Sequence, residues 1–152
     1  MSKKVVAFSL VALLVVVYIL DTYTPITISH SLLMRSFLHA NIAHLAINCY
    51  ALYTFIMSPL PPYSLRYCCP MAYVISVFAF ACSPTCAVGA SGFIYALLGM
   101  IVARHRTKRN IIICAIFIAF SLLPQLATTI HIVSLLLGFT STKLIDYARQ
   151  YV

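Results

Sequence analysis

The sequence contains very few acidic residues and no tryptophan. Of its 152 residues only two are Asp or Glu, and charged residues make up only 8% of the chain. A soluble domain of this size needs far more charge on its surface, so this class is excluded. The residues present are mainly apolar, with 63% of the chain hydrophobic. The composition therefore predicts an all-α polytopic membrane protein with a single domain over residues 1–152.

Other absences narrow the function further. Without tryptophan, the aromatic side chains at the membrane interfaces must come from the 10 Tyr and 9 Phe residues. The 6 cysteines lack metal-ligand spacing, so we expect no metal and no other cofactor. Only Cys82 and Cys86 share a loop. In an oxidising compartment they could form a disulfide, although two free thiols are the expected state.

Charged residues and prolines divide the chain into six apolar stretches. We expect each stretch to be a membrane-spanning helix, and they cover Val5–Leu20, Ile42–Met57, Cys68–Ala81, Ser91–Ala103, Ile111–Leu123 and Thr129–Ile145. Several are shorter than the ~20 residues that cross a full bilayer core, so helix ends must extend into the loops or the bilayer must be thin. The first stretch lacks a small-residue cleavage site, which favours a span over a signal peptide.

The basic residues predict the orientation of these spans. All of the 10 Lys and Arg residues except Arg35 lie at chain ends, in loops or near the end of the sixth span, and six spans place all of these on one side of the membrane. Positive residues accumulate in cytoplasmic loops, so both termini are predicted to be cytoplasmic. We expect the protein to lie in the cell membrane. This rule also accounts for the net charge of +8, so we expect no nucleic-acid partner.

Polar residues lie at a similar depth near the outer ends of three spans. His44 and Asn48 begin the second span, Ser91 begins the fourth, and His131 is near the start of the sixth. The i, i+4 spacing places His44 with Asn48, and Ser91 with Tyr95, on shared helix faces. An imidazole in hydrocarbon is costly and needs a reason to be there. The joint pattern predicts a Ser–His hydrolytic site that opens to the outer face.

Small residues predict close packing of the fourth and sixth spans. They form stripes along both, at Gly92, Ala96, Gly99 and Ala103, and at Ser134, Gly138 and Ser141. Close packing would let a serine hydroxyl approach a histidine nitrogen to about 2.6–3.2 Å. Each of these features alone is weaker evidence for a catalytic site, because stripes of small residues often serve only helix packing. We expect Ser9, Ser76 and Ser121 to bond their own helices and His39 to lie at the interface.

Together the motifs resemble those of the rhomboid family of intramembrane serine proteases. That family carries H-x-x-x-x-H-x-x-x-N in its second span, G-x-S-G followed by tyrosine in its fourth, and histidine followed by spaced glycines in its sixth. The resemblance covers all six spans. The matching residues are His39, His44, Asn48, Gly89, Ser91, Gly92, Tyr95, His131 and Gly138.

The resemblance implies a six-helix rhomboid-like bundle within membrane lipid, and a serine endopeptidase that cuts transmembrane segments of membrane proteins. Ser91 would be the nucleophile and His131 the base, with His44 and Asn48 in the oxyanion hole. Tyr95, Gly89 and Gly92 would orient and pack the site. The fifth span with the Pro124–Thr129 loop would be a moving gate.

The chain departs from the family pattern at three positions. His30 and Ser31 stand where a Trp-Arg pair is usual in the first outer loop, and Ser134 replaces a glycine after the catalytic histidine. That loop is also short. These changes put substrate access in question and remove no catalytic group.

Acid residues offer no third member for a catalytic triad. Asp146 lies 15 residues beyond His131 on one helix, roughly 22 Å away. Asp21 has no obvious path to the imidazole, so a Ser–His dyad is predicted. Two alternatives remain: a catalytically silent rhomboid-like protein that binds membrane clients, and a small transporter or channel subunit. The second would need ionisable residues along several spans, and the spans lack acids.

Overall fold

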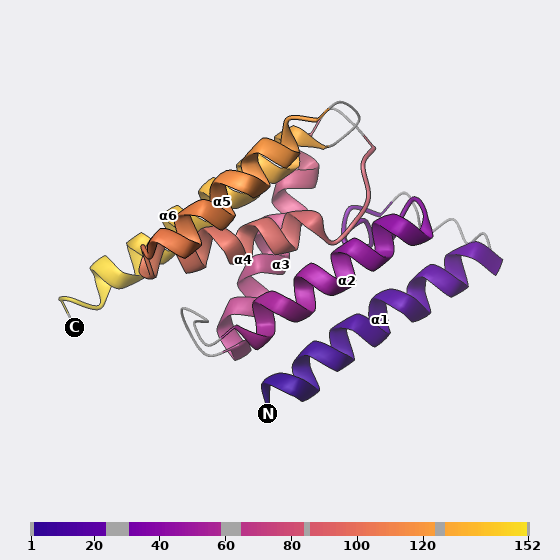
Figure 1. Ribbon diagram of the computed structural model, residues 1–152, viewed down its shortest axis with the longest axis horizontal. Coiled ribbons are helices and arrows are strands. Elements are labelled where there is room, and N and C mark those ends of the chain that lie inside the picture. Colours follow the sequence, from indigo (N-terminus) through magenta and orange to yellow (C-terminus); the bar gives the residue numbers. More distant parts are fainter. Residues whose placement is uncertain (1, 24–30, 59–64, 84–85, 124–126, 152) are drawn as a thin grey trace.

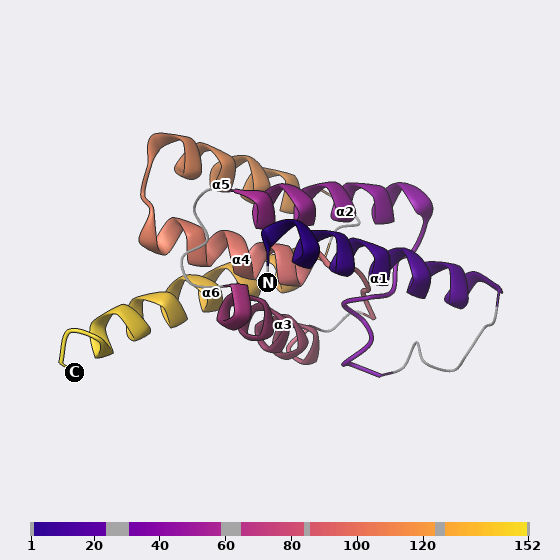
Figure 2. The same cartoon turned by 90° about the horizontal axis from the view of Figure 1, so that it is seen from below.

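The computed structural model describes residues 2–23, 31–58, 65–83, 86–123 and 127–151. Within these ranges the chain forms six α-helices and no β-strand, which confirms the predicted all-α class. The helices are α1 (Lys3–Tyr23), α2 (Ile42–Met57), α3 (Leu65–Ala81), α4 (Ser91–Arg104), α5 (Lys108–Ser121) and α6 (Thr128–Ala148). Figures 1 and 2 show them gathered into one bundle, in which α4 packs against α2, α3, α5 and α6.

Capping side chains set the starts of two helices. The Asn41 side chain accepts the backbone N–H of His44 at 2.8 Å, and α2 begins at the next residue after Asn41. Such a cap satisfies one of the N–H groups that the first turn of a helix leaves without a partner. The observed α2, Ile42–Met57, coincides with the predicted stretch at both ends.

The fifth helix is shifted relative to the sequence prediction. Thr107 caps it by accepting the N–H of Asn110 at 3.2 Å, so α5 runs over Lys108–Ser121 and not over Ile111–Leu123. Its first turn therefore carries two basic residues that the prediction left in the loop. The other helices keep their predicted apolar stretches and extend into the flanking residues by at most three positions.

Judged by length and composition, two helices, α1 and α6, are long and apolar enough to cross a membrane, and each has 21 residues. The helices α2, α3 and α4 are apolar but shorter, with 16, 17 and 14 residues. Large apolar side chains on five different helices are more than half exposed: Phe8, Ile47, Val74, Ile116 and Leu136. A surface of this kind is expected where the solvent is hydrocarbon instead of water.

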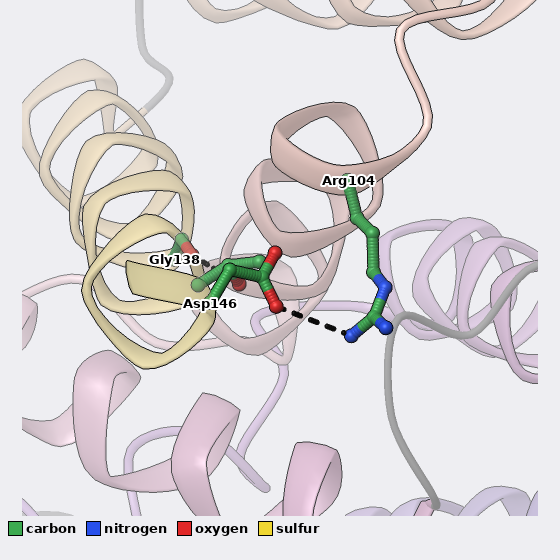
Figure 3. Close-up of polar contacts among 4 residues, drawn as sticks. Arg104, Gly138 and Asp146 are labelled. Atoms are coloured by element: carbon green, nitrogen blue, oxygen red, sulfur yellow. Dashed lines mark hydrogen bonds and ion pairs between the residues drawn. The ribbon is translucent and has the colours of Figure 1, made fainter. Parts of the chain in front are cut away.

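Polar contacts join helix termini at the basic end of the bundle, where the start of α1 and the ends of α2, α4 and α6 lie. Lys3 Nζ donates to the carbonyl oxygen of Ser58 at 2.7 Å, which joins the start of α1 to the end of α2. Arg104 and Asp146 form an ion pair at 3.3 Å between the ends of α4 and α6 (Figure 3). Figure 1 shows the start of α1 and the end of α6 on the same side of the bundle.

We expect this basic end of the bundle to face the cytoplasm, because Lys and Arg accumulate in cytoplasmic loops. Reporter fusions placed after Arg109 and after Val152 should report the cytoplasm. A fusion between Ser83 and Ala87 should report the outer side. An outer-side signal at either of the first two positions would contradict the six-span arrangement.

The helices α4 and α6 pack backbone to backbone. A Cβ atom on Gly99 would collide with the carbonyl of Leu135 and lie 2.9 Å from Phe139 N. A Cβ atom on Gly138 would lie 3.0 Å from Ala96 Cα. The predicted small-residue stripes therefore face each other, and only glycine permits this approach at the two crossing points.

Candidate active site

Ser91 and His131 meet at the end of the bundle opposite the basic residues. Ser91 is the first residue of α4, and His131 lies in the first turn of α6. Ser91 Oγ and His131 Nε2 are 2.9 Å apart, within hydrogen-bonding distance. His131 is only 5% exposed, whereas Ser91 is half-buried. The hydroxyl is therefore the more accessible member of the pair.

The turn before α4 sets the position of Ser91. Gly89 has φ +131, a backbone conformation that favours glycine, and its N–H donates to the Arg35 carbonyl at 2.8 Å. The His44 ring packs against Gly89, where a Cβ atom would lie 2.6 Å from His44 Cε1. Glycine at position 89 thus allows both the turn and the approach of the imidazole.

The ring of Tyr95 lies against the imidazole of His131. The two rings are stacked, with centroids 4.3 Å apart and planes 5° from parallel. Nδ1 of His131 has no hydrogen-bond partner among the residues that the structure describes. Asp146 is held by Arg104 at the basic end, so it cannot serve as a third member. Among the described residues, the imidazole therefore has a ring contact with Tyr95 and no carboxylate partner.

His44 and Asn48 occupy the first turns of α2. The side-chain N–H of Asn48 donates to the His44 carbonyl at 2.8 Å, and Asn48 is 4% exposed. An amide nitrogen carries two protons, so one N–H of Asn48 is left for another acceptor. His44 reaches the Ser91 turn through its packing on Gly89.

His39, for which the sequence predicts a place at the membrane interface, is buried within the protein, with 5% of its surface exposed. Burial first, and then the neighbouring His44, lowers the pKa of His39 to about 4, although the Phe37 carbonyl opposes this shift. A neutral ring can donate from Nδ1 to Phe37 O at 3.1 Å and accept the Ala90 N–H on Nε2 at 3.4 Å. It therefore ties the loop before α2 to the residue before Ser91.

Three buried serine hydroxyls lie near the site. Ser36 Oγ and Ser76 Oγ are 2.9 Å apart, so Ser76 bonds a residue outside its own helix, whereas the sequence predicted a bond within that helix. A Cβ atom on Gly92 would lie 2.6 Å from Ser76 Oγ and 3.3 Å from Ser134 Oγ. A larger residue at position 92 would therefore have to displace the Ser76 hydroxyl where α4 packs between α3 and α6.

The main contact that the sequence did not predict is the one between Ser121 and Tyr95. The Ser121 hydroxyl bonds its own helix at Phe117 O, as expected, but also lies 2.6 Å from the hydroxyl of Tyr95. No spacing rule joins two residues on different helices. The only available signal was a serine in an apolar stretch near the depth of Ser91.

The outer loops are described in part. Cys82 and Cys86 are exposed free thiols, and Arg35 Nη2 lies 3.8 Å from Cys86 Sγ. His30 and half of the proposed gate loop, residues 124–126, lie outside the described residues. Ser31, at the other position of the family's Trp-Arg pair, accepts the Met34 N–H on its carbonyl at 3.0 Å.

The fold defines the general class as an all-helical protein in which a serine and a histidine from two apolar helices lie within hydrogen-bonding distance. The Rhomboid domain family model matches residues 26–148, which is most of the chain. The chain therefore belongs to the rhomboid family and is an integral membrane protein. Comparison with curated proteins finds no match.

Proposed function

We propose that this protein is an intramembrane serine endopeptidase that uses a Ser91–His131 dyad. The observation that carries the proposal is the 2.9 Å contact between Ser91 Oγ and His131 Nε2 in a family of membrane proteins. Nucleophile and base within hydrogen-bonding distance, with the base oriented by a third group, is the general signature of covalent hydrolysis. Here the third group is Tyr95.

In this mechanism Ser91 attacks the carbonyl carbon of the scissile peptide bond. His131 Nε2 accepts the hydroxyl proton and then donates it to the leaving amine, which forms an acyl-enzyme. Water then attacks the acyl-enzyme, again with His131 as base. The Tyr95 ring, 4.3 Å from the imidazole, stabilises the positive charge that the base carries between these steps.

The negative charge of the tetrahedral intermediate needs donors close to Ser91. The backbone N–H of Ser91 at the start of α4 and the side chains of His44 and Asn48 would supply them. The second N–H of Asn48 is available for this role because only one is bonded to the His44 carbonyl.

Substrates in this proposal are single-span membrane proteins. Hydrocarbon stabilises helices, so a substrate must unwind locally to present an extended peptide bond. Because Ser91 is half-buried and His131 is buried, the peptide must come to Ser91 from the exposed side of the pair.

A fluorophosphonate probe on the detergent-purified protein tests the proposal. We expect covalent labelling of wild-type protein and none of the Ser91→Ala variant, because the probe reacts only with an activated serine. A folded wild-type protein that is not labelled and cleaves no single-span substrate would instead support the silent rhomboid-like alternative.

Replacement of an oxyanion donor should leave residual activity. We expect Asn48→Ala or His44→Ala to lower kcat by about 10²–10³-fold, because one donor among several is lost. Their effects should not add, since both side chains are proposed to donate to the same oxyanion. Asn110→Ala is the control, because Asn110 is also buried and bonds the His105 carbonyl at 2.8 Å. Wild-type kcat in Asn48→Ala would exclude Asn48 from the oxyanion hole.

A further inference from the structure

The helix α5 is attached to the bundle in an unusual way. Most of its surface is apolar and open, and Ile112, Ile116 and Phe120 are each more than half exposed. The two residues of α5 that are buried, Asn110 and Ser121, are both polar. Asn110 bonds the loop just before its own helix. Ser121, which is 0% exposed, bonds another helix and lies at the end of α5 nearest the catalytic pair.

The contacts of Ser121 fix the hydroxyl of Tyr95 at two points. Tyr95 Oη donates to the Phe117 carbonyl at 2.6 Å, and Ser121 Oγ lies 2.6 Å from Tyr95 Oη. Each hydroxyl has a single proton. Since Tyr95 gives its proton to Phe117 O, the single proton of Ser121 is shared between Tyr95 Oη at 2.6 Å and Phe117 O at 2.9 Å, and the shorter contact makes Tyr95 Oη its main acceptor. Among the residues that the structure describes, the end of the Tyr95 side chain is held by α5, while its ring lies against His131.

A second contact joins the same turn of α5 to the start of α6. Thr128 Oγ1 donates to the Ser121 carbonyl at 2.6 Å, three residues before His131. The turn that contains Ser121 thus contacts both the ring that orients the base and the helix that carries it.

We infer that Ser121 is a positioning residue that holds Tyr95 over His131 and so makes the orientation of the base depend on the placement of α5. The inference rests on the proposed function for its effect on rate. Its structural part, the control of the Tyr95–His131 stack, can be measured without any substrate.

The first test measures kcat and KM for a labelled single-span substrate in liposomes. Ser121→Ala should lower kcat by about 2- to 10-fold, the loss expected for one hydrogen bond, with KM unchanged. Ser141→Ala is the matched control, because Ser141 is half-buried and its hydroxyl bonds only the Leu137 carbonyl, at 2.6 Å. An unchanged kcat in Ser121→Ala, or an equal loss in Ser141→Ala, would overturn the inference.

A double-mutant cycle with Tyr95→Phe separates positioning from general destabilisation. If Ser121 acts through the Tyr95 hydroxyl, Ser121→Ala should have little further effect on kcat in the Tyr95→Phe background. Full additivity of the two losses would mean that Ser121 acts by another route.

The second test uses NMR of histidine-labelled protein without substrate. The His131 signal is identified by its absence from the His131→Ala spectrum. Stacking on Tyr95 should shift its ring protons upfield, and Ser121→Ala should reduce that displacement while Ser141→Ala leaves it unchanged. An unaltered His131 signal in Ser121→Ala overturns the inference even if the wild type is an active protease. A reduced displacement in a protein that cleaves nothing would instead refute the proposed function and retain the positioning role.

Discussion

Ser91→Ala and His131→Ala are each expected to abolish cleavage of a single-span substrate in liposomes. The two side chains share one hydrogen bond of 2.9 Å, and either substitution removes the activated nucleophile. In serine proteases such losses are on the order of 10⁶-fold in kcat and do not add, because nucleophile and base act as a unit. The double variant should therefore be no worse than either single variant.

Two substitutions of the same kind control for this result. Ser141→Ala removes a serine hydroxyl from α6, and His105→Ala removes an imidazole after the end of α4. Both should cleave at close to the wild-type rate, and all variants should be compared at equal amounts of folded protein. Undiminished cleavage by Ser91→Ala would end the protease proposal whatever the other variants showed.

Apolar stretches bounded by charged residues and prolines made much of the fold predictable. The bounds of α2 follow from an apolar stretch that starts just after Asn41, a strong N-cap residue, and stops before a Ser-Pro pair. The start of α4 follows from the turn at Gly89. The bounds of α5 did not follow, because Lys108 and Arg109 were assigned to a loop on charge alone. Basic side chains can extend away from hydrocarbon, so they can occupy the first turn of a helix.

The candidate site was predictable where it depends on spacing within one helix. The i, i+4 rule places Ser91 with Tyr95 and His44 with Asn48, and each pair lies one turn apart in the structure. Contacts between distant parts of the chain were not predictable in this way. His39 reaches Ala90 across 51 positions, and Ser121 reaches Tyr95 across 26. Both are tertiary hydrogen bonds, for which a single sequence carries no periodic signal.

Gly99→Val is expected to be nearly as damaging as loss of a catalytic group, although Gly99 lies two turns from Ser91. A Cβ atom at this position would collide with the Leu135 carbonyl and lie 2.9 Å from Phe139 N. Backbone atoms cannot rotate away as a side chain can, so α4 and α6 must separate. Ser91 and His131 are carried by these two helices, and a displacement of about 1 Å can cost about 10²-fold in rate.

The measurement is kcat in liposomes together with the thermal midpoint of unfolding, and both should fall. Gly99→Ala should show a smaller loss in the same direction, because the Cβ atom alone already meets the backbone of α6. Ala12→Val is the control, since it places the same branched side chain on an exposed position of α1. It should change neither quantity. If Gly99→Val kept a rate within about twofold of wild type, close contact of α4 with α6 would not be what holds Ser91 Oγ at hydrogen-bonding distance from His131 Nε2.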